Sequence, residues 1–597
     1  MAMIFDSQNR FYKSNFGAVA QDTEVEFSVL LPKDIGATYV GLVVERDDFP
    51  NFYAELVRCD EQDGCFIYSG KYIFDVIGLA WYYFKVVTDN GEFFVVKNSD
   101  NSSIGVISNN IAQKFQQTVY DKNLSTPDRF KGGIMYQIFP DRFFQSESDK
   151  ADVPSDRILR SDWGGVPHFL PNEDGKILNN DYFCGNLKGI EQKLDYLTSL
   201  GVDCIYLNPI FEAHSNHRYD TADYMKIDPL LGRDEDFCSL CKKAHEKGIA
   251  IILDGVFSHT GSDSIYFNKN HRYPDIGAYD SPDSRYYSWF NFTHYPEKYS
   301  AWWGIVTMPE TNEDDPNFRE FICGKHGVIR HWLKLGADGF RLDVADELTD
   351  GIIDDIRITI KSEGKENILI GEVWENASNK ESYGNLRRYL LGNQLDSVMN
   401  YPFKEAILDF LGDKNINAFS AKIMTILENY PKPILDVLMN SISTHDTLRA
   451  ITRLAGESCE GKDRTWQSEH YLDVDGYIFG KKLLKLAMVL QFMLPGIPCI
   501  YYGDEVGMQG YKDPFNRGCF PWGQEDNDML CFVRGLSAIR KKFPCLKAGE
   551  LEFLDVRGLL VFRRYDSTGS VTVAINVSDT SNEFCGKPID YYGYLII

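Results

Sequence analysis

The chain has 597 residues, which is too many for one hydrophobic core and enough for a large barrel with smaller attached domains. Its 62 Lys and Arg residues face 87 Asp and Glu residues, so the formal net charge is −25 at pH 7. This charge disfavours nucleic-acid backbones and anionic membrane surfaces as partners. We therefore expect an uncharged substrate and no binding to nucleic acid or to a membrane.

The N-terminal part of the chain alternates apolar and polar residues in short runs, such as 23–31, 37–45 and 81–88. This pattern predicts an N-terminal β-sandwich over residues 1–125. The N-terminus lacks a basic segment followed by an apolar one, and the longest apolar stretch is interrupted by a glutamine and two prolines. We therefore expect a cytoplasmic protein, with a truncated secreted chain as the alternative.

From residue 134 the pattern changes to helical apolar spacing, then a glycine, then a short buried strand. Continuous apolar strands are covered on both faces, which indicates a parallel sheet wrapped by helices. The class is therefore α/β, and eight candidate strands predict a (β/α)8 TIM barrel over 126–543, with its active site at the C-terminal ends of the strands. The candidate strands are 134–139, 204–207, 250–257, 339–344, 368–373, 397–401, 438–443 and 498–503.

Two further segments depart from the barrel pattern. A long aromatic and polar stretch at about 257–325 exceeds an ordinary loop and predicts a subdomain inserted after the third strand. Short alternating runs return near the end of the chain and predict a C-terminal β-sandwich over 544–597.

Thirteen cysteines are scattered along the chain without the density of a disulfide scaffold. Cys238 and Cys241 have the spacing of a metal-binding pair, but no second pair accompanies them and the surrounding sequence predicts a helix. Two core-facing positions on one helix are the better interpretation. We therefore predict no zinc site and no other metal ligands.

Three carboxylates lie at the ends of predicted strands: Asp343 in GFRLDV, Glu372 in ILIGEV and Asp446 just after LMNSIS. Burying such a group is costly unless it is paired or functional. Each one alone could equally be a strand-end capping residue, but three at the same relative position share a reason. Cleavage of an acetal needs an acid for the leaving oxygen and a second carboxylate that attacks the anomeric carbon or activates water. The pattern therefore predicts cleavage of a glycosidic bond.

The neighbouring residues indicate separate roles for these carboxylates. Arg341 precedes Asp343 by two strand positions, so it points to the same side and would keep Asp343 ionised, which suits a nucleophile. Glu372 lies between apolar residues, where loss of water favours the protonated form, which suits a general acid. Asp446 would bind sugar hydroxyls and oppose the positive charge of the transition state.

In chain order, DGVFSHTG, GFRLDVADE, GEVWENA and STHDTLR resemble the motifs of the α-amylase superfamily, glycoside hydrolase family thirteen. The likeness covers about 130–550 and implies a retaining mechanism with the same roles for the three carboxylates. It also implies that His259 and His445 bind sugar hydroxyls. In HSNHRYDTADY it implies that Tyr219 stacks beneath the cleaved sugar and that His217 lies at the edge of the cleft.

The segments MPETNEDDP, LDSVMNYPF and DPFNRGCFPW are similar to the neopullulanase, cyclomaltodextrinase and maltogenic amylase group, which also has a sandwich before its barrel. Members of that group typically act on cyclodextrins, maltooligosaccharides and pullulan, and often pair as dimers through the N-terminal domain. The likeness implies that Asp513 and Arg517 hold a donor-side sugar and that Trp374 borders the acceptor side. A simple ion pair within the loop is an equal alternative for Asp513 and Arg517.

The likeness leaves the function open among three alternatives. The first is a hydrolase of α-1,4 bonds, with α-1,6 bonds as a further target, in maltooligosaccharides, cyclodextrins, pullulan or starch. The second is a transglycosylase resembling 4-α-glucanotransferases, because water and an acceptor hydroxyl compete for the same glycosyl-enzyme. The third is a glucan-binding protein without catalysis, which the presence of all three carboxylates disfavours.

Two positions argue against a calcium ion. Ser258 and Asn186 stand where the family usually has Asn and Asp at calcium-binding positions. An acidic loop at 146–156 offers oxygen ligands, but runs of charge are more often simply solvated. We therefore expect an enzyme that requires no cofactor, with calcium as a disfavoured ligand.

Overall fold

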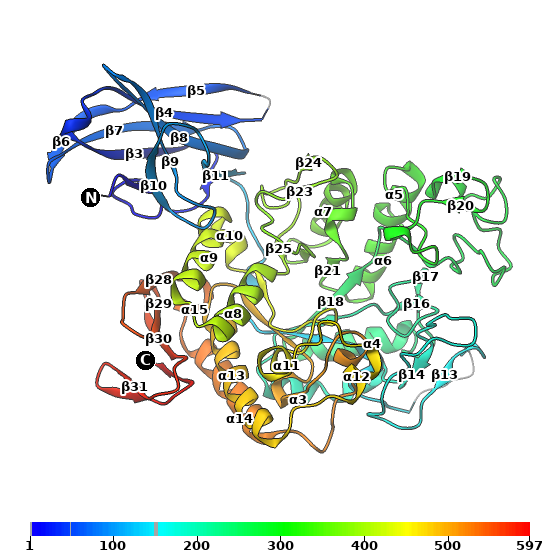
Figure 1. Cartoon of the computed structure of the whole chain (residues 1–597). Helices are drawn as coiled ribbons and strands as arrows, with labels where there is room; N and C mark the ends of the chain where they lie inside the picture. Colours follow the sequence, from blue (N-terminus) through cyan, green and yellow to red (C-terminus); the bar gives the residue numbers. More distant parts are fainter. Residues whose placement is uncertain (1–2, 48, 148–152) are drawn as a thin grey trace. The chain divides into compact units, whose positions relative to one another are not determined.

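The computed structural model describes residues 3–47, 49–147 and 153–597, and the chain divides into two compact units. The first unit contains the N-terminal region and two later segments, which are Met1–Thr126, Glu375–Asp396 and Asn417–Leu435. The second unit contains the rest of the chain, namely Pro127–Trp374, Ser397–Ile416 and Asp436–Ile597. Figure 1 labels many elements of both units.

The N-terminal region of the first unit is built from two β-sheets, as predicted. One sheet has the order β1-β10-β9-β8-β11-β2, with β4 and β5 continuing from β8, and the other has the order β3-β7-β6. Buried side chains of both sheets, such as Phe27 and Tyr82, pack into one core. The strands are β1 (Phe5–Asp6), β2 (Val19–Ala20), β3 (Thr23–Pro32), β4 (Ala37–Arg46), β5 (Phe49–Glu55), β6 (Val57–Gln62), β7 (Cys65–Phe74), β8 (Gly78–Thr88), β9 (Gly91–Lys97), β10 (Ile104–Ser108) and β11 (Phe115–Tyr120).

The later segments of the first unit add short elements to it. They are β23 (Glu381–Ser382), β24 (Asn385–Leu386), α9 (Ile416–Asn429), which begins at the boundary, and α10 (Lys432–Leu435). Hydrogen bonds join these segments to the sandwich: Asp121 donates from its backbone to Leu391, and Gln116 donates to the hydroxyl of Ser378 at 2.8 Å. A segment that follows Trp374 in sequence therefore packs with the N-terminal sheets.

The second unit contains the predicted parallel barrel. All eight predicted strands form, in the order β25-β22-β21-β18-β15-β12-β27-β26, and every neighbouring pair is parallel. A parallel bridge between Met399 and Met439 joins the two ends of this order. The strands are β12 (Met135–Ile138), β15 (Cys204–Leu207), β18 (Ala250–Gly255), β21 (Gly339–Leu342), β22 (Ile368–Gly371), β25 (Ser397–Val398), β26 (Met439–Asn440) and β27 (Ile497–Tyr501).

Alternate strand residues fill the inside of the barrel. Cys204 and Tyr206, Ala250 and Ile252, and the equivalent pairs of other strands are buried together in one apolar cluster. The two-residue period of a strand produces this arrangement, because side chains of one parity face inward and those of the other face the helices. Because side chains fill the inside of the barrel, residues that could contact a ligand are expected at the strand ends.

Helices follow the strands along the chain, for example α4 after β15 and α7 after β21. Both helices are labelled in Figure 1. Helix ends carry favourable charges: α4 begins with three acidic residues, and α14 ends with Arg540 and two lysines, which complement the helix dipole. The helices of the second unit are α1 (Pro140–Phe143), α2 (Leu187–Gln192), α3 (Leu194–Ser199), α4 (Asp234–Glu246), α5 (Pro316–Cys323), α6 (Val328–Leu335), α7 (Asp350–Glu363), α8 (Tyr401–Asp413), α11 (Ala450–Ala455), α12 (Arg464–Glu469), α13 (Val474–Met493), α14 (Asn527–Lys542) and α15 (Cys545–Ala548).

The stretch between β18 and β21 has an aromatic core of its own, in which Phe267 contacts Phe290, Phe292 and Tyr299. Its hairpin consists of β19 (Phe292–His294) and β20 (Lys298–Tyr299). The chain ends in an antiparallel sheet of β28 (Glu550–Leu554), β29 (Leu560–Asp566), β30 (Gly569–Asn576) and β33 (Gly593–Ile596). No helix among the described residues is long and apolar enough to cross a bilayer.

Candidate active site

The three predicted carboxylates lie at the C-terminal ends of barrel strands. Asp343 directly follows β21, Glu372 directly follows β22, and Asp446 lies in the loop beyond β26. Because β21 and β22 are parallel neighbours, the residues that follow them emerge at the same edge of the sheet. Asp343 and Glu372 are buried, whereas the side chain of Asp446 keeps 31% of its surface exposed.

Arg341 joins the carboxylates into one cluster. Its Nη1 lies 2.8 Å from Oδ1 of Asp343 and 2.7 Å from Oδ1 of Asp254, a residue of β18. Its Nη2 lies 2.7 Å from Oε2 of Glu372. The guanidinium is fully buried, so these ion pairs form away from solvent. The sequence predicted the contact with Asp343, but one arginine shared among three carboxylates was not foreseen.

Burial of the cluster raises the pKa of Asp343 well above its usual range; Arg341 opposes this shift, and the charges of Glu372 and Asp254 add to it. Burial also raises the pKa of Asp446 to about 7, and the charge of Glu372 acts in the same direction. The pKa values of Asp343 and Asp446 therefore depend on the charges of their neighbours as well as on burial. The sequence predicted that Arg341 would favour the ionised form of Asp343; Arg341 does lower this pKa, but burial is the larger effect and the net shift is upward.

The carboxylate of Glu372 is held by donors on both of its oxygens. The indole Nε1 of Trp374 donates to Oε1 at 3.0 Å, and the backbone N–H of Val344 donates to Oε2 at 2.8 Å. Trp374 itself stacks on Tyr401 with ring centroids 4.1 Å apart and an angle of 10°. Trp374 is 45% exposed, so it offers an aromatic surface directly beside Glu372.

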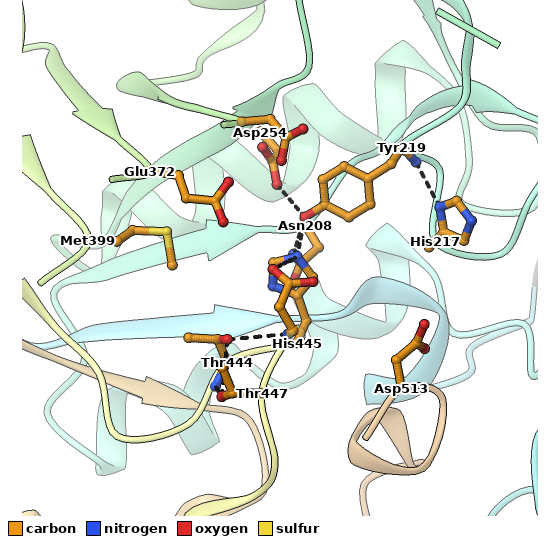
Figure 2. A network of polar contacts seen from close by, with 12 residues as sticks. Asn208, His217, Tyr219, Asp254, Glu372, Met399, Thr444, His445, Thr447 and Asp513 are labelled. Carbon is orange, nitrogen blue, oxygen red and sulfur yellow. Dashed lines mark hydrogen bonds and ion pairs between the residues drawn. The ribbon is translucent and has the colours of Figure 1, made fainter. Parts of the chain in front are cut away.

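Tyr219 lies at the centre of a second set of contacts, shown in Figure 2. Its hydroxyl donates to Oδ2 of Asp254 at 2.9 Å, accepts from Nδ2 of Asn208 at 3.0 Å and contacts Nε2 of His445. The backbone N–H of Tyr219 donates to Nδ1 of His217 at 3.1 Å. Burial lowers the pKa of His445 well below its usual range and also lowers that of His217, so both rings are neutral in the free site.

His259 faces the same tyrosine from the loop after β18. Its Nε2 lies 3.1 Å from the carbonyl oxygen of Tyr219, and burial lowers its pKa to about 4. The ring of Trp302 lies 5.3 Å from that of His259, and Trp303 stacks on Trp302 at 4.7 Å with an angle of 7°. Trp303 is 71% exposed and its Nε1 donates to Glu347 at 3.0 Å. An aromatic surface therefore runs from His259 outward.

Arg517 contacts Asp513, Asp446 and His445. Its Nη1 pairs with Asp513 at 3.0 Å, its Nη2 lies 3.4 Å from Oδ1 of Asp446, and its Nε donates to the carbonyl of His445 at 2.9 Å. Nε2 of His445 lies 3.1 Å from Oδ2 of Asp446. The ion pair between Asp513 and Arg517, which was one of the two interpretations from the sequence, is thus present. Arg517 also contacts the candidate catalytic residue Asp446.

A comparison with models of known protein families identifies the family of this chain. Residues 137–542 match the model described as alpha amylase, catalytic domain. The chain belongs to this α-amylase family.

Several relatives of known name resemble the chain within this family. An amylopullulanase from Thermoanaerobacter thermohydrosulfuricus is 36% identical over 607 residues, covering 93% of this chain and 40% of that protein. A cyclomaltodextrinase from Geobacillus thermopakistaniensis (strain MAS1) is 33% identical, covering 79% of this chain and 73% of that protein. The chain spans less than half the length of the amylopullulanases that it matches. Among solved structures, the type III pullulan hydrolase from Thermococcus kodakarensis covers 100% of both chains with a TM-score of 0.68 and 25% identity.

All eleven site residues named from the sequence belong to one connected network in this amylase fold. They are Asp343, Glu372, Asp446, Tyr219, His259, Arg341, His445, Trp374, Asp513, Arg517 and His217. The network also includes residues that sequence reasoning did not place there, namely Asp254, Asn208, Gln137, Tyr401 and Trp302. Of these, Asp254 lies inside a motif that was recognised, and Gln137 and Asn208 follow the same strand-end rule as the carboxylates.

The positions discussed for calcium have protein partners. Oγ of Ser258 lies 3.1 Å from Nδ1 of His259, and Asn186 caps α2 by accepting from the backbone of Gly189 at 2.7 Å. Of the acidic loop at 146–156, residues 148–152 lie outside the described part of the chain. In the described ranges, no three His, Cys, Asp or Glu side chains are arranged to hold a metal ion.

Proposed function

We propose that the chain is a retaining α-glucan hydrolase. Its targets are α-1,4 glucosidic bonds, with α-1,6 bonds as a further target, in maltooligosaccharides, cyclodextrins, pullulan or starch. The observation that carries this proposal is the cluster in which Arg341 contacts both Asp343 and Glu372 on neighbouring strand ends. The names of the relatives, which include amylopullulanase, cyclomaltodextrinase and pullulan hydrolase, support the choice of substrates.

In the first step, a carboxylate oxygen of Asp343 attacks the anomeric carbon while Glu372 donates its proton to the leaving glycosidic oxygen. Oδ1 of Asp343 pairs with Arg341, so Oδ2 is the attacking atom. The productive arrangement has the proton on Glu372 and leaves Asp343 ionised. Asp446 opposes the positive charge that develops on the sugar ring.

In the second step, Glu372 accepts a proton from water, and the resulting hydroxide attacks the anomeric carbon while the bond to Asp343 breaks. Two inversions give net retention of configuration. The reaction therefore needs only carboxylates and water, and we propose that no metal or other cofactor takes part.

The residues around the carboxylates suit a sugar chain. Tyr219 has its ring next to the carboxylates, and we propose that sugar hydroxyls replace contacts that the rings of His259 and His445 make with protein groups in the free site. Trp374 beside Glu372 and the Trp302–Trp303 stack beyond His259 add apolar faces of the kind on which sugar rings pack. We propose that these tryptophans hold the leaving side of the glucan.

Transglycosylation is the second candidate, because an acceptor sugar held on the tryptophan surface would compete with water for the glycosyl-enzyme. Chromatography of the products from maltoheptaose distinguishes the two reactions. Hydrolysis predicts glucose, maltose and other short products from the start. Products longer than maltoheptaose that dominate throughout would refute hydrolysis as the main reaction, and the absence of any turnover would favour a glucan-binding protein.

We also propose that the protein pairs as a homodimer through the N-terminal sandwich. Strand β5 pairs with β4 alone among the described strands, and it exposes Phe49, Phe52 and Tyr53, the last by 58%. Such an edge strand favours pairing with another chain. Sedimentation velocity should give a dimer for the natural chain and a monomer for Tyr53→Asp, and a monomer for both would refute the proposal. A cytoplasmic location stays a prediction.

A further inference from the structure

Gln137, at the end of β12, joins two parts of the site. Its side chain is fully buried, and its amide Nε2 lies 3.0 Å from Oδ1 of Asn208 and 2.9 Å from Nδ1 of His445. Its Oε1 has no hydrogen-bond partner among the described residues. A buried amide that leaves its oxygen unpaired is unusual, so the orientation of this amide has to be derived from the groups around it.

The direction of the hydrogen bonds follows from Asp254. Arg341 pairs with Oδ1 of Asp254 at 2.7 Å, and the hydroxyls of Tyr206 and Tyr219 both lie on Oδ2, at 2.6 and 2.9 Å. The ion pair with Arg341 favours the carboxylate form of Asp254, and a carboxylate carries no proton and can only accept. Asp254 therefore accepts all three contacts, and Tyr219 is a donor to it.

The same reasoning continues along the chain of contacts. Because the hydroxyl proton of Tyr219 goes to Asp254, the hydroxyl must accept from Asn208, so Nδ2 of Asn208 faces Tyr219. Oδ1 of Asn208 then faces Gln137 and accepts from Nε2 of Gln137. This assigns the orientation of both amides, which heavy-atom positions alone leave open.

We infer that Gln137 is a positioning residue that fixes the tautomer of His445. An amide nitrogen has two protons and accepts none, so the ring nitrogen beside it, Nδ1 of His445, must be the unprotonated acceptor. The ring proton is then on Nε2. Figure 2 shows His445 below Tyr219, the neighbour that Nε2 contacts.

The tautomer matters for the chemistry, and this consequence rests on the proposed function. Nε2–H then donates to the hydroxyl oxygen of Tyr219 and lies 3.1 Å from Oδ2 of Asp446, so a sugar hydroxyl that enters here meets a donor. The opposite tautomer would place a lone pair against Asp446 and lose that donor. Orienting residues of this kind act through a catalytic-site histidine without touching substrate.

Neutron diffraction from crystals of the fully deuterated, full-length protein tests the assignment directly. We expect a deuteron on Nε2 of His445 and none on Nδ1. In Gln137→Glu, whose carboxylate can only accept, we expect a deuteron on Nδ1. A deuteron on Nδ1 in the natural protein, or the same His445 protonation in both proteins, would overturn the inference.

Kinetic measurements on Gln137→Met and on a matched control variant distinguish a positioning role of Gln137 from a role in packing alone. Gln491 is also buried, donates from Nε2 to two carbonyls at 3.0 and 2.8 Å, and leaves its Oε1 without a partner. We expect Gln137→Met to lower kcat on maltoheptaose about ten-fold or more with little change in KM, and Gln491→Met to leave kcat within about two-fold. Equal losses in both variants, or an unchanged kcat in Gln137→Met, would refute the role. A deuteron on Nε2 in a protein without any glucan turnover would refute the proposed function and leave the tautomer assignment intact.

Discussion

Arg517 should set the acid side of the pH profile through Asp446. Burial and the charge of Glu372 raise the pKa of Asp446 to about 7, while Arg517, 3.4 Å away, opposes that shift. Asp446 must be ionised to oppose the charge of the transition state. Removal of a neighbouring positive charge disfavours the carboxylate, so Arg517→Met should move the acid limb of kcat/KM to higher pH.

The magnitude follows from the geometry of the pair. Two unit charges 3.4 Å apart interact by about 1 kcal/mol in water and about 5 kcal/mol at an effective dielectric constant of 20. At about 1.4 kcal/mol per unit, this range corresponds to roughly one to three and a half pKa units. Arg517 also pairs with Asp513 at 3.0 Å, and Asp446 is 31% exposed, so the lower end of the range applies. We expect a shift of about one unit.

The assay is kcat/KM on maltoheptaose between about pH 4.5 and 9, because this ratio reports the ionisation of the free enzyme. Arg517→Lys keeps the charge and should leave the acid limb close to that of the natural enzyme. Lys512→Met removes an exposed charge of the same loop and should leave the limb unchanged. The reasoning fails if the limb of Arg517→Met does not move, or if Lys512→Met moves it by the same amount.

Three further outcomes are expected. Asp343→Asn and Glu372→Gln should each lose nearly all activity, at least about a thousand-fold, with an unchanged circular dichroism spectrum, and natural-like turnover in either variant would refute the assigned roles. Trp303→Ala should raise KM for maltoheptaose several-fold but leave the unfolding midpoint nearly unchanged, because the ring is 71% exposed; an unchanged KM would remove this tryptophan from the substrate surface. Dialysis against EDTA should leave activity intact, and a loss that calcium restores would contradict the metal-free mechanism.

The barrel was predictable because its strands carry a local signal. Runs such as 250–253 are continuously apolar, and they are buried on both faces in the structure. The strand-end rule then placed Asp343 and Glu372 on one edge, since parallel neighbours end together. The short strands β25 and β26 show the limit of this signal, because each has only two residues. Most of the residues predicted as strand in 397–401 and 438–443 lie outside these two strands.

The electrostatics of the site were less predictable than its residues. From the sequence, Arg341 had one partner two positions away, whereas in the fold it also meets Asp254 and Glu372 from two other strands. A pKa depends on the sum of burial and all nearby charges, and sequence spacing reports only one of those terms. This is why the net upward shift of the Asp343 pKa does not follow from the spacing of Arg341 and Asp343 in the sequence.

The sequence by itself determined the α/β class and the eight strands and named the candidate site residues, because strand periodicity and motif order are local properties of the chain. Only the tertiary structure decided how those residues share protons and partners. The contact of Gln137 with His445 spans 308 positions in sequence, and that of Arg517 with Asp446 spans 71. Closure of the barrel brings such distant strand ends together, and the directions of the resulting hydrogen bonds follow from the complete network.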